Sequence, residues 1–351
     1  MLLALAAGGL SLKGLDASAL TPRTLVFPRD HGAHPELRTE WWYITGHADS
    51  AGREFGFQVT FFRTRVDAAQ TLQSKFAARQ LIFAHAALTD LQGRGLWHDQ
   101  RIARAGFGIA QADEADTHLQ LRDWSLTRQA DGSYQARVPS QAFGLELRFA
   151  PTQPLLLQGQ GGLSRKGPDA SQASYYYSQP QLQASGQLRL NDRALSVTGR
   201  AWLDHEWSET LMHPEAVGWD WIGMNLDDGS ALTAFRLRRA DGSALWDGGS
   251  FRPAGGQAQA FAPGQTQFTA LRWWTSAASD ARYAVEWGVA CPAGRFTVHA
   301  LLDAQELDSR ASTGAIYWEG LAELRNAQGQ PVGRGYLEMT GYSRPLSLPG
   351  S

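Results

Sequence analysis

Turn-forming dipeptides divide this chain into short segments in which apolar and polar residues alternate. In FGFQVTF, residues 55–61, every second residue is apolar, which is the period of a β-strand with one buried face. Sustained helical periodicity with capping residues is missing, apart from weak indications of short helices near 74–80 and around Glu209. The sequence therefore predicts an all-β protein built from hairpins. The turn signals are Asp131-Gly132, Asn191-Asp192, Asp228-Gly229, Asp241-Gly242 and Gln328-Gly329.

The length of 351 residues exceeds that of one typical hydrophobic core, so two domains are expected. Two stretches rich in Gly, Gln, Ala and Ser, 158–174 and 253–264, are predicted to be loops. The first stretch indicates a boundary, which we place so that the domains cover 24–184 and 185–351. Each half is expected to form an antiparallel β-barrel or sandwich.

A faint internal repeat supports the division. Trp42-x-x-x-Gly46 precedes a turn and a Phe-rich strand, and Trp219-x-x-x-Gly223 precedes the Asp228-Gly229 turn and another strand. Chance could also produce this similarity, because Trp and Gly are frequent in the chain.

The N-terminal segment 1–23 resembles a leader. Residues 2–10 are apolar, and Ala17-Ser18-Ala19 resembles a cleavage site, although no basic stretch comes first. We predict a periplasmic or otherwise exported protein; the alternative is a disordered or surface-packed leader. No other segment is apolar over the length that a membrane span requires.

Composition excludes several function classes. The net charge is −2 with scattered Lys and Arg, which argues against nucleic acid as a partner. The single cysteine, Cys291, cannot form an intrachain disulfide. Phosphate-binding loops, dinucleotide fingerprints and G-x-S-x-G elbows are missing, so no cofactor is predicted. Asp30-His31 and His34-Pro35-Glu36 lack the spacing of metal ligands, and no metal site is predicted.

The segment 202–207, WLDHEW, concentrates groups that could carry chemistry. Because neighbours on a strand alternate between faces, Asp204 and Glu206 point one way and His205 and Trp207 the other. An inward acid face would raise one carboxyl pKa. An inward His205/Trp207 face would line an apolar cavity instead. The structural alternative is that His205 is a hydrogen-bonded core histidine and Asp204 anchors a loop.

Other acids and indoles stand close together elsewhere in the chain. Trp219 and Trp221 share a face that could bind an apolar molecule or form a packed core, and Asp220 takes the opposite face. The candidate ligand-binding residues are Trp219, Asp220, Trp221, Glu40, Trp42, Tyr177, Trp318 and Glu319.

Eight segments in order resemble the motif series of one family. They are HPELRTEWWYITG, FGFQVTFFR, HAALTD, YYYSQPQL, VTGRAWLDHEWS, GWDWIGMNLDDG, YWEG and GRGYLEMTGY. The chain is similar, over about 27–343, to the AttH-like, carotenoid-hydratase-type lipocalin family. The resemblance implies two lipocalin-like domains with a ligand cavity near their junction. The family includes envelope proteins loosely described as secreted hydrolases and often encoded beside ABC transporters, together with carotenoid hydratases and fungal pericyclic cyclases.

The family resemblance also indicates which residues of 202–207 line the pocket. His205-x-Trp207 matches a His–Trp pair of the hydratases, and this match favours the His205/Trp207 face as the one that lines the pocket. The hydratases' downstream Tyr and Asp have no assignable counterpart here.

Two functional hypotheses follow. In the first, the chain acts on a bulky isoprenoid, lipid or secondary metabolite by hydration, isomerisation or cyclisation. Asp204 or Glu206 would protonate an alkene, Trp207 or Trp219 would stabilise the cation, and His205 would orient water. In the second, the chain is a non-enzymatic envelope carrier that works with ABC-transporter components.

Overall fold

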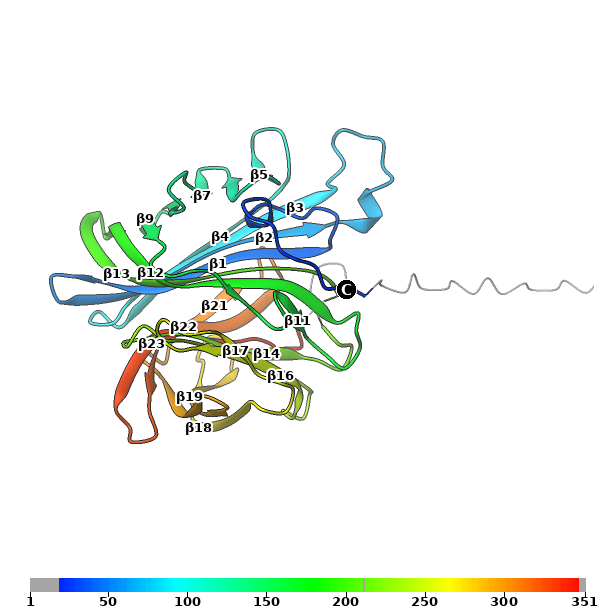
Figure 1. Ribbon diagram of the computed structural model, residues 1–351. Coiled ribbons are helices and arrows are strands. Elements are labelled where there is room, and N and C mark those ends of the chain that lie inside the picture. Colours follow the sequence, from blue (N-terminus) through cyan, green and yellow to red (C-terminus); the bar gives the residue numbers. More distant parts are fainter. Residues whose placement is uncertain (1–18, 211, 347–351) are drawn as a thin grey trace, which may run out of the picture.

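The computed structural model describes residues 19–210 and 212–346 and contains two antiparallel sheets, one per half of the chain (Figure 1). All five predicted turn signals connect consecutive paired strands, which confirms the hairpins. The described helical segments are two short 3-10 helices, η1 (Arg29–His31) and η2 (Asp67–Ala69). The short helices expected near 74–80 and Glu209 are not formed: the first segment is irregular with a turn at 75–76, and Glu209 lies within the strand that ends at Thr210. No helix among the described residues is long and apolar enough to cross a membrane.

The first sheet has thirteen strands in the order β4-β3-β2-β1-β13-β12-β9-β8-β7-β6-β5, with β10 and β11 beside β12. The sheet curls until β3 and β4 contact β5 and β6, which makes a nearly closed barrel. Its strands are β1 (Thr39–Ser50), β2 (Arg53–Arg65), β3 (Gln80–Asp90), β4 (Gly95–Arg104), β5 (Ala110–Ala112), β6 (His118–Leu121), β7 (Trp124–Arg128), β8 (Tyr134–Pro139), β9 (Phe143–Ala150), β10 (Leu156–Leu157), β11 (Leu163–Arg165), β12 (Ala173–Leu190) and β13 (Arg193–Thr210).

The second sheet has ten strands in the order β17-β16-β15-β14-β23-β22-β20-β19-β18, with β21 beside β22. Its strands are β14 (Gly218–Leu226), β15 (Ala231–Arg238), β16 (Ala244–Arg252), β17 (Gln259–Ala260), β18 (Gln267–Thr275), β19 (Arg282–Cys291), β20 (Gly294–Ala300), β21 (Glu306–Ser309), β22 (Ala315–Arg325) and β23 (Pro331–Met339).

The two sheets divide at a different point from the predicted boundary. Residues 184 and 185 both lie within β12, which continues to Leu190 and pairs with β13 in the first sheet. The chain passes to the second sheet only between β13 and β14. The Gly- and Gln-rich stretch 158–174, predicted to be a loop, contains the short strand β11 and the start of β12, and it returns to the same sheet, so its composition marks a connection rather than a domain boundary. Most of the predicted leader, residues 1–18, lies outside the described residues.

Three hydrophobic clusters explain how the layers pack. One fills the barrel, and a second lies on the far side of the second sheet. The third cluster, which includes Tyr43, Trp202, Trp221, Leu321 and Tyr336, joins the two sheets. The central strands of both sheets are therefore buried on both faces, and the strands β1, β13, β14 and β23 meet where the halves stack (Figure 1).

Candidate active site between the two sheets

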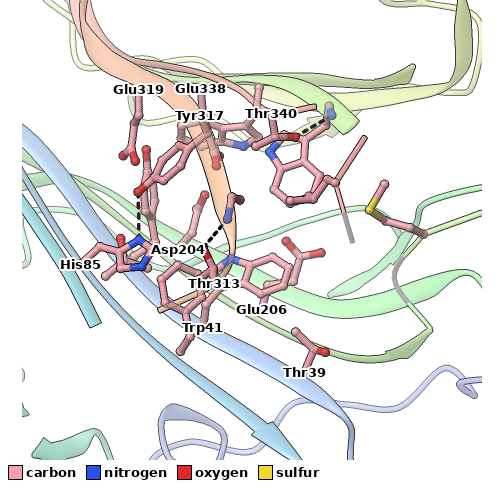
Figure 2. Close-up of a pocket in the computed structure, with 18 of the residues that line it drawn as sticks. Thr39, Trp41, His85, Asp204, Glu206, Thr313, Tyr317, Glu319, Glu338 and Thr340 are labelled. Atoms are coloured by element: carbon pink, nitrogen blue, oxygen red, sulfur yellow. Dashed lines mark hydrogen bonds between the residues drawn. The ribbon is translucent and has the colours of Figure 1, made fainter. Parts of the chain in front are cut away.

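A cavity of about 150 Å³ lies between the sheets. Its walls come from β1, β2, β3, β12 and β13 on one side and from β14, β15, β22 and β23 on the other (Figure 2). Most of the lining is aromatic or aliphatic. A volume of this size resembles that of a protein cavity that accommodates one benzene ring. The ionisable side chains in the walls, besides tyrosines, are His85, Lys166, Asp204, Glu206, Glu319 and Glu338.

Asp204 on β13 accepts hydrogen bonds from three side chains. Tyr176 donates to its Oδ2 at 2.7 Å, while Ser178 and the Trp202 indole donate to Oδ1 at 2.5 and 2.7 Å. Ser178 lies directly opposite Asp204 in the β12–β13 pairing. Burial raises the pKa of Asp204 to about 7, although the three donors oppose this shift. Asp204 can therefore act as a proton donor near neutral pH.

Glu206, two residues further along the same face, has a cationic partner. Lys166 Nζ lies 2.9 Å from Glu206 Oε1, and the Ser174 hydroxyl also donates to this oxygen. The ammonium group stands 4.8 Å from the Tyr176 ring centroid and 4.3 Å from that of Phe235. This arrangement makes Glu206 half of an ion pair and distinguishes it from Asp204, which has only uncharged donors.

The second sheet contributes two more carboxyls. Glu319 on β22 and Glu338 on β23 lie directly opposite each other in the strand pairing. Burial, together with the neighbouring Glu338, raises the pKa of Glu319 well above its usual value. Burial also raises the pKa of Glu338 to about 7. Neither carboxyl forms an ion pair with a described residue, so the pair favours sharing a proton over carrying two charges.

The aromatic wall is formed by Trp219 and Trp221 of β14. The Trp221 indole donates to the Tyr176 hydroxyl at 3.3 Å and meets Tyr43 edge-on, with 5.4 Å between ring centroids. A Cβ on Gly223 would overlap the Trp221 ring, so the glycine of the second Trp-x-x-x-Gly segment makes room for this indole. Trp219 is only partly buried and faces the cavity.

His205 and Trp207 do not line this cavity, in contrast to the preference suggested by the His-x-Trp match. They point into the barrel, where both are fully buried. Register explains the difference: β1 and β13 pair Tyr43 with Asp204 and Trp42 with His205, so the even-numbered residues of β13 face the second sheet. The predicted split of the two faces holds, and it is the acid face that meets the cavity.

Inside the barrel, His205 belongs to a hydrogen-bond network centred on Glu40. His205 Nε2 and His34 Nδ1 lie 2.9 and 2.7 Å from Glu40 Oε1, and Arg63 donates to Oε2 at 2.8 Å. Tyr177 lies 3.2 Å from His205 Nδ1. These hydrogen bonds and the Arg63 charge hold the pKa of Glu40 well below its usual value despite burial. Burial lowers the pKa of His205 to about 4.

His34, Glu40 and His205 also place three potential metal-ligand atoms within 4.8 Å of one another. Both histidines already hydrogen-bond the same carboxylate oxygen, and Arg63 compensates its charge. A guanidinium beside the carboxylate opposes the addition of a cation. The residues present therefore fit a hydrogen-bond network better than a metal centre.

The remaining predicted residues divide between the two faces of their strands. Trp42 and Tyr177 lie in the barrel core, and Trp318 lies in the core behind the second sheet. Asp220 shares that far side, where Arg236 and Arg238 lie 2.7 and 3.1 Å from its Oδ2. Of the predicted set, the cavity is lined by Asp204, Glu206, Trp219, Trp221 and Glu319.

Several cavity residues were not predicted from the sequence. Strand alternation could have indicated Tyr176, because on β12 its side chain points to the opposite face from those of Tyr175 and Tyr177. Lys166 lies in the stretch assigned to a loop. His85 and Tyr317 form a 3.0 Å hydrogen bond across the two sheets, drawn in Figure 2, that no local pattern could reveal.

The fold and the cavity define a class: a two-sheet, lipocalin-like β protein with an acidic and aromatic cavity between its sheets. Residues 18–342 match the family model described as AttH-like, and the chain belongs to that family. Among proteins with curated descriptions, no sequence matches it.

Solved structures agree with this assignment. The crystal structure of an AttH candidate from Nitrosomonas europaea is 47% identical, with a TM-score of 0.87, over 93% of this chain and 99% of that one. Kievitone hydratase from Nectria haematococca is 14% identical, with a TM-score of 0.72, over 92% of this chain and 94% of its own. CghA bound to Sch210972 is 12% identical, with a TM-score of 0.53, over 88% of each chain. The last two likenesses show the shared fold alone.

Proposed function

We propose that this protein binds a largely apolar small molecule between its sheets and performs acid-assisted chemistry on it, with Asp204 as the proton donor. One observation carries the proposal: a buried carboxyl with a pKa of about 7 faces an aromatic cavity. The name of one protein with this fold, kievitone hydratase, denotes hydration and motivates that choice of reaction.

The distribution of polarity in the cavity suggests how a ligand would lie. Asp204, Tyr43 and Glu319 are buried, whereas Trp41, Phe62 and other lining residues are only partly buried. The volume accepts about one ring. A ring with its reactive carbon near Asp204 would fill the cavity, and the remainder of a bulkier isoprenoid or secondary metabolite would extend past the partly buried aromatic residues.

The proposed hydration proceeds through a protonated alkene. The Asp204 proton forms a C–H bond with one alkene carbon, using the π electron pair, and leaves a cation on the other carbon. Nearby indole faces stabilise such a cation. A water oxygen then bonds to the cationic carbon, and the proton that it loses returns to the Asp204 carboxylate. Isomerisation or cyclisation would share the first step and differ in which group quenches the cation.

Native mass spectrometry of freshly purified protein tests binding and supplies the ligand. We expect an apolar molecule to co-purify and to be converted on incubation. If it is released unchanged under all conditions, the enzymatic proposal fails, and the protein is a carrier, as expected of an exported accessory to a transporter.

The pH profile of conversion reports on the proposed acid. Because the folded-state pKa of Asp204 is raised to about 7, the protonated donor is present below this pH and is lost above it. We therefore expect kcat/KM to fall as pH rises through about 7. Glu338, also at about 7, would contribute to the same limb, so the measurement is repeated on Glu338→Gln. A flat or rising profile between pH 6 and 9 in both proteins would contradict the role of Asp204.

Trp219→Ala should weaken binding of the co-purifying molecule. Losing the apolar contact of one indole corresponds to roughly 1.5–3 kcal/mol, or about 10- to 150-fold in Kd. Trp273→Ala is the matched control, because Trp273 is 42% exposed on β18 and does not line the cavity. Isothermal titration calorimetry compares the two variants, and an equal effect in both would locate the ligand elsewhere.

A further inference from the structure

Two loops at one end of the first sheet expose a pair of stacked aromatic rings. Phe76 lies in the connection between β2 and β3, which projects beyond the ends of these strands (Figure 1), and Phe107 lies in the connection between β4 and β5. The ring centroids are 5.5 Å apart, with an angle of 4° between the planes. Phe76 is nevertheless 60% exposed and Phe107 54% exposed. The two loops therefore present aromatic surface to the solvent.

Basic side chains border the two rings. The guanidinium carbon of Arg104 lies 4.2 Å from the ring centroid of Phe107 and 5.4 Å from that of Phe76. Arg104 also donates to the Phe76 carbonyl at 3.0 Å, which ties one loop to the other. Lys75 Nζ lies 5.4 Å from the Phe76 centroid. Neither Lys75 nor Arg104 forms an ion pair with a described residue, so their charges are available to a partner.

The segments 71–80 and 101–110, which contain these residues, gather much of the exposed apolar surface. Nine large apolar side chains are exposed among the described residues, and five of them belong to these segments: Leu72, Phe76, Ile102, Phe107 and Ile109. The segments also contain four basic residues and no acidic residue. Together these side chains form the Phe76 patch. Exposed apolar residues that gather in this way mark an interaction surface.

A row of apolar side chains connects the Phe76 patch with the cavity. Ile102 on the edge strand β4 pairs with Phe83 on β3, which pairs in turn with Phe62 on β2. Phe62 pairs with Trp41 on β1. Residues that pair in register share one face of a sheet, so the four side chains are neighbours. Phe62 and Phe83 stack with 4.9 Å between centroids, and both line the cavity together with Trp41.

The chemistry of the patch selects a membrane surface as its partner. Aromatic side chains insert at the boundary between lipid headgroups and acyl chains, and Lys and Arg are attracted to anionic lipids. Single-stranded nucleic acid would stack its bases on free ring faces, whereas Phe76 and Phe107 stack on each other beneath Arg104. The apolar row adds a second reason, because a bilayer is where an apolar molecule accumulates.

We propose that the Phe76 patch docks on the surface of a membrane that contains anionic lipids. Docking in this orientation brings the Ile102 end of the row to the bilayer, so that an apolar ligand can pass between the lipid and the cavity. The docking goes beyond the proposed function, whereas the passage of a ligand rests on it.

Co-sedimentation with sucrose-loaded vesicles tests the docking with no ligand present. We expect binding to vesicles of equal parts phosphatidylcholine and phosphatidylglycerol, and binding at least about tenfold weaker to phosphatidylcholine alone. High salt should weaken the binding, because it screens the attraction between the basic residues and the lipid. The double variant Lys75→Gln/Arg104→Gln should bind the anionic vesicles about 10- to 30-fold more weakly. Phe76→Ser/Phe107→Ser should weaken binding about tenfold.

Trp273 on β18 offers a matched control. It is an exposed aromatic residue with an arginine against its ring, since the Arg282 guanidinium carbon lies 4.8 Å from the centroid, but it belongs to the second sheet. Trp273→Ser should leave vesicle binding unchanged. All the substituted side chains are exposed or partly exposed, so thermal unfolding should show an intact fold in every variant.

The outcomes separate the docking from the proposed function. If the protein does not sediment with anionic vesicles, the docking proposal is wrong, and a patch that serves a protein partner would give this result. Equal losses of binding in Trp273→Ser and Phe76→Ser/Phe107→Ser would also contradict it, because the protein would then bind lipid through no particular face. Vesicle binding by a protein with which no apolar molecule co-purifies would uphold the docking and remove the passage of a ligand.

Discussion

Asp204→Asn is expected to reduce turnover of the co-purifying ligand by about 10²- to 10⁴-fold while leaving its affinity within a few-fold. The asparagine side chain has nearly the same shape and keeps an oxygen for the Ser178 and Trp202 donors. What it lacks is a proton that can be transferred to carbon. The loss should therefore appear in kcat rather than in binding, and single-turnover kinetics with the isolated ligand measures the two separately.

The control for this variant is another buried aspartate that accepts hydrogen bonds. Asp247 receives the backbone N–H groups of Gly264 and Thr266 and does not line the cavity. Asp247→Asn should keep turnover within a few-fold. If Asp204→Asn converts the ligand at the unaltered rate, general-acid chemistry at Asp204 is ruled out.

Glu40→Ala should lower the free energy of unfolding by about 3–5 kcal/mol, since it leaves the buried Arg63 charge without its partner. His34 and His205 lose their shared acceptor in the same variant. Chemical denaturation followed by tryptophan fluorescence gives this free energy. Glu54→Ala, which breaks the partly exposed pair with Arg334, should cost no more than about 1 kcal/mol. Equal losses in the two variants would show that the Glu40 network adds little to stability.

The Glu40 network also determines how the stability of the fold changes as pH falls. Folding lowers the pKa of Glu40, so its stabilising contribution is present above the ordinary glutamate pKa and is lost as pH falls. The difference in stability between the unaltered protein and Glu40→Ala should therefore shrink on acidification.

Local patterns predicted much of this fold because hairpins are local. Alternation and turn residues gave the strands, and the same alternation separated Asp204 and Glu206 from His205 and Trp207. Strand alternation alone could not decide which of these faces meets the cavity, since β13 is buried on both sides and each face carries polar groups with partners. The His-x-Trp resemblance favoured the barrel side, whereas pairing with β1 turns the acids toward the second sheet.

The residues missed by sequence reasoning depend on contacts between distant segments. Glu319 stood out beside a tryptophan, but its partner Glu338 becomes visible only when β22 and β23 are aligned. Lys166 could not be recognised from the sequence, because its ion-pair partner, Glu206, lies forty positions away. Composition marked its segment as a loop, and composition carries no information about where a loop returns.

Two separately packed sheets form the two walls of the cavity. Tyr317, Glu319 and Trp219 line the cavity from a sheet whose hydrophobic core is distinct from that of the barrel. Under the proposed function, substitutions on that wall would alter which molecule is accepted and would leave the Glu40 network, which links β1 to β13, undisturbed. Under the proposed function, remodelling one wall would change the substrate while Asp204, the proposed proton donor, stays fixed on the other wall.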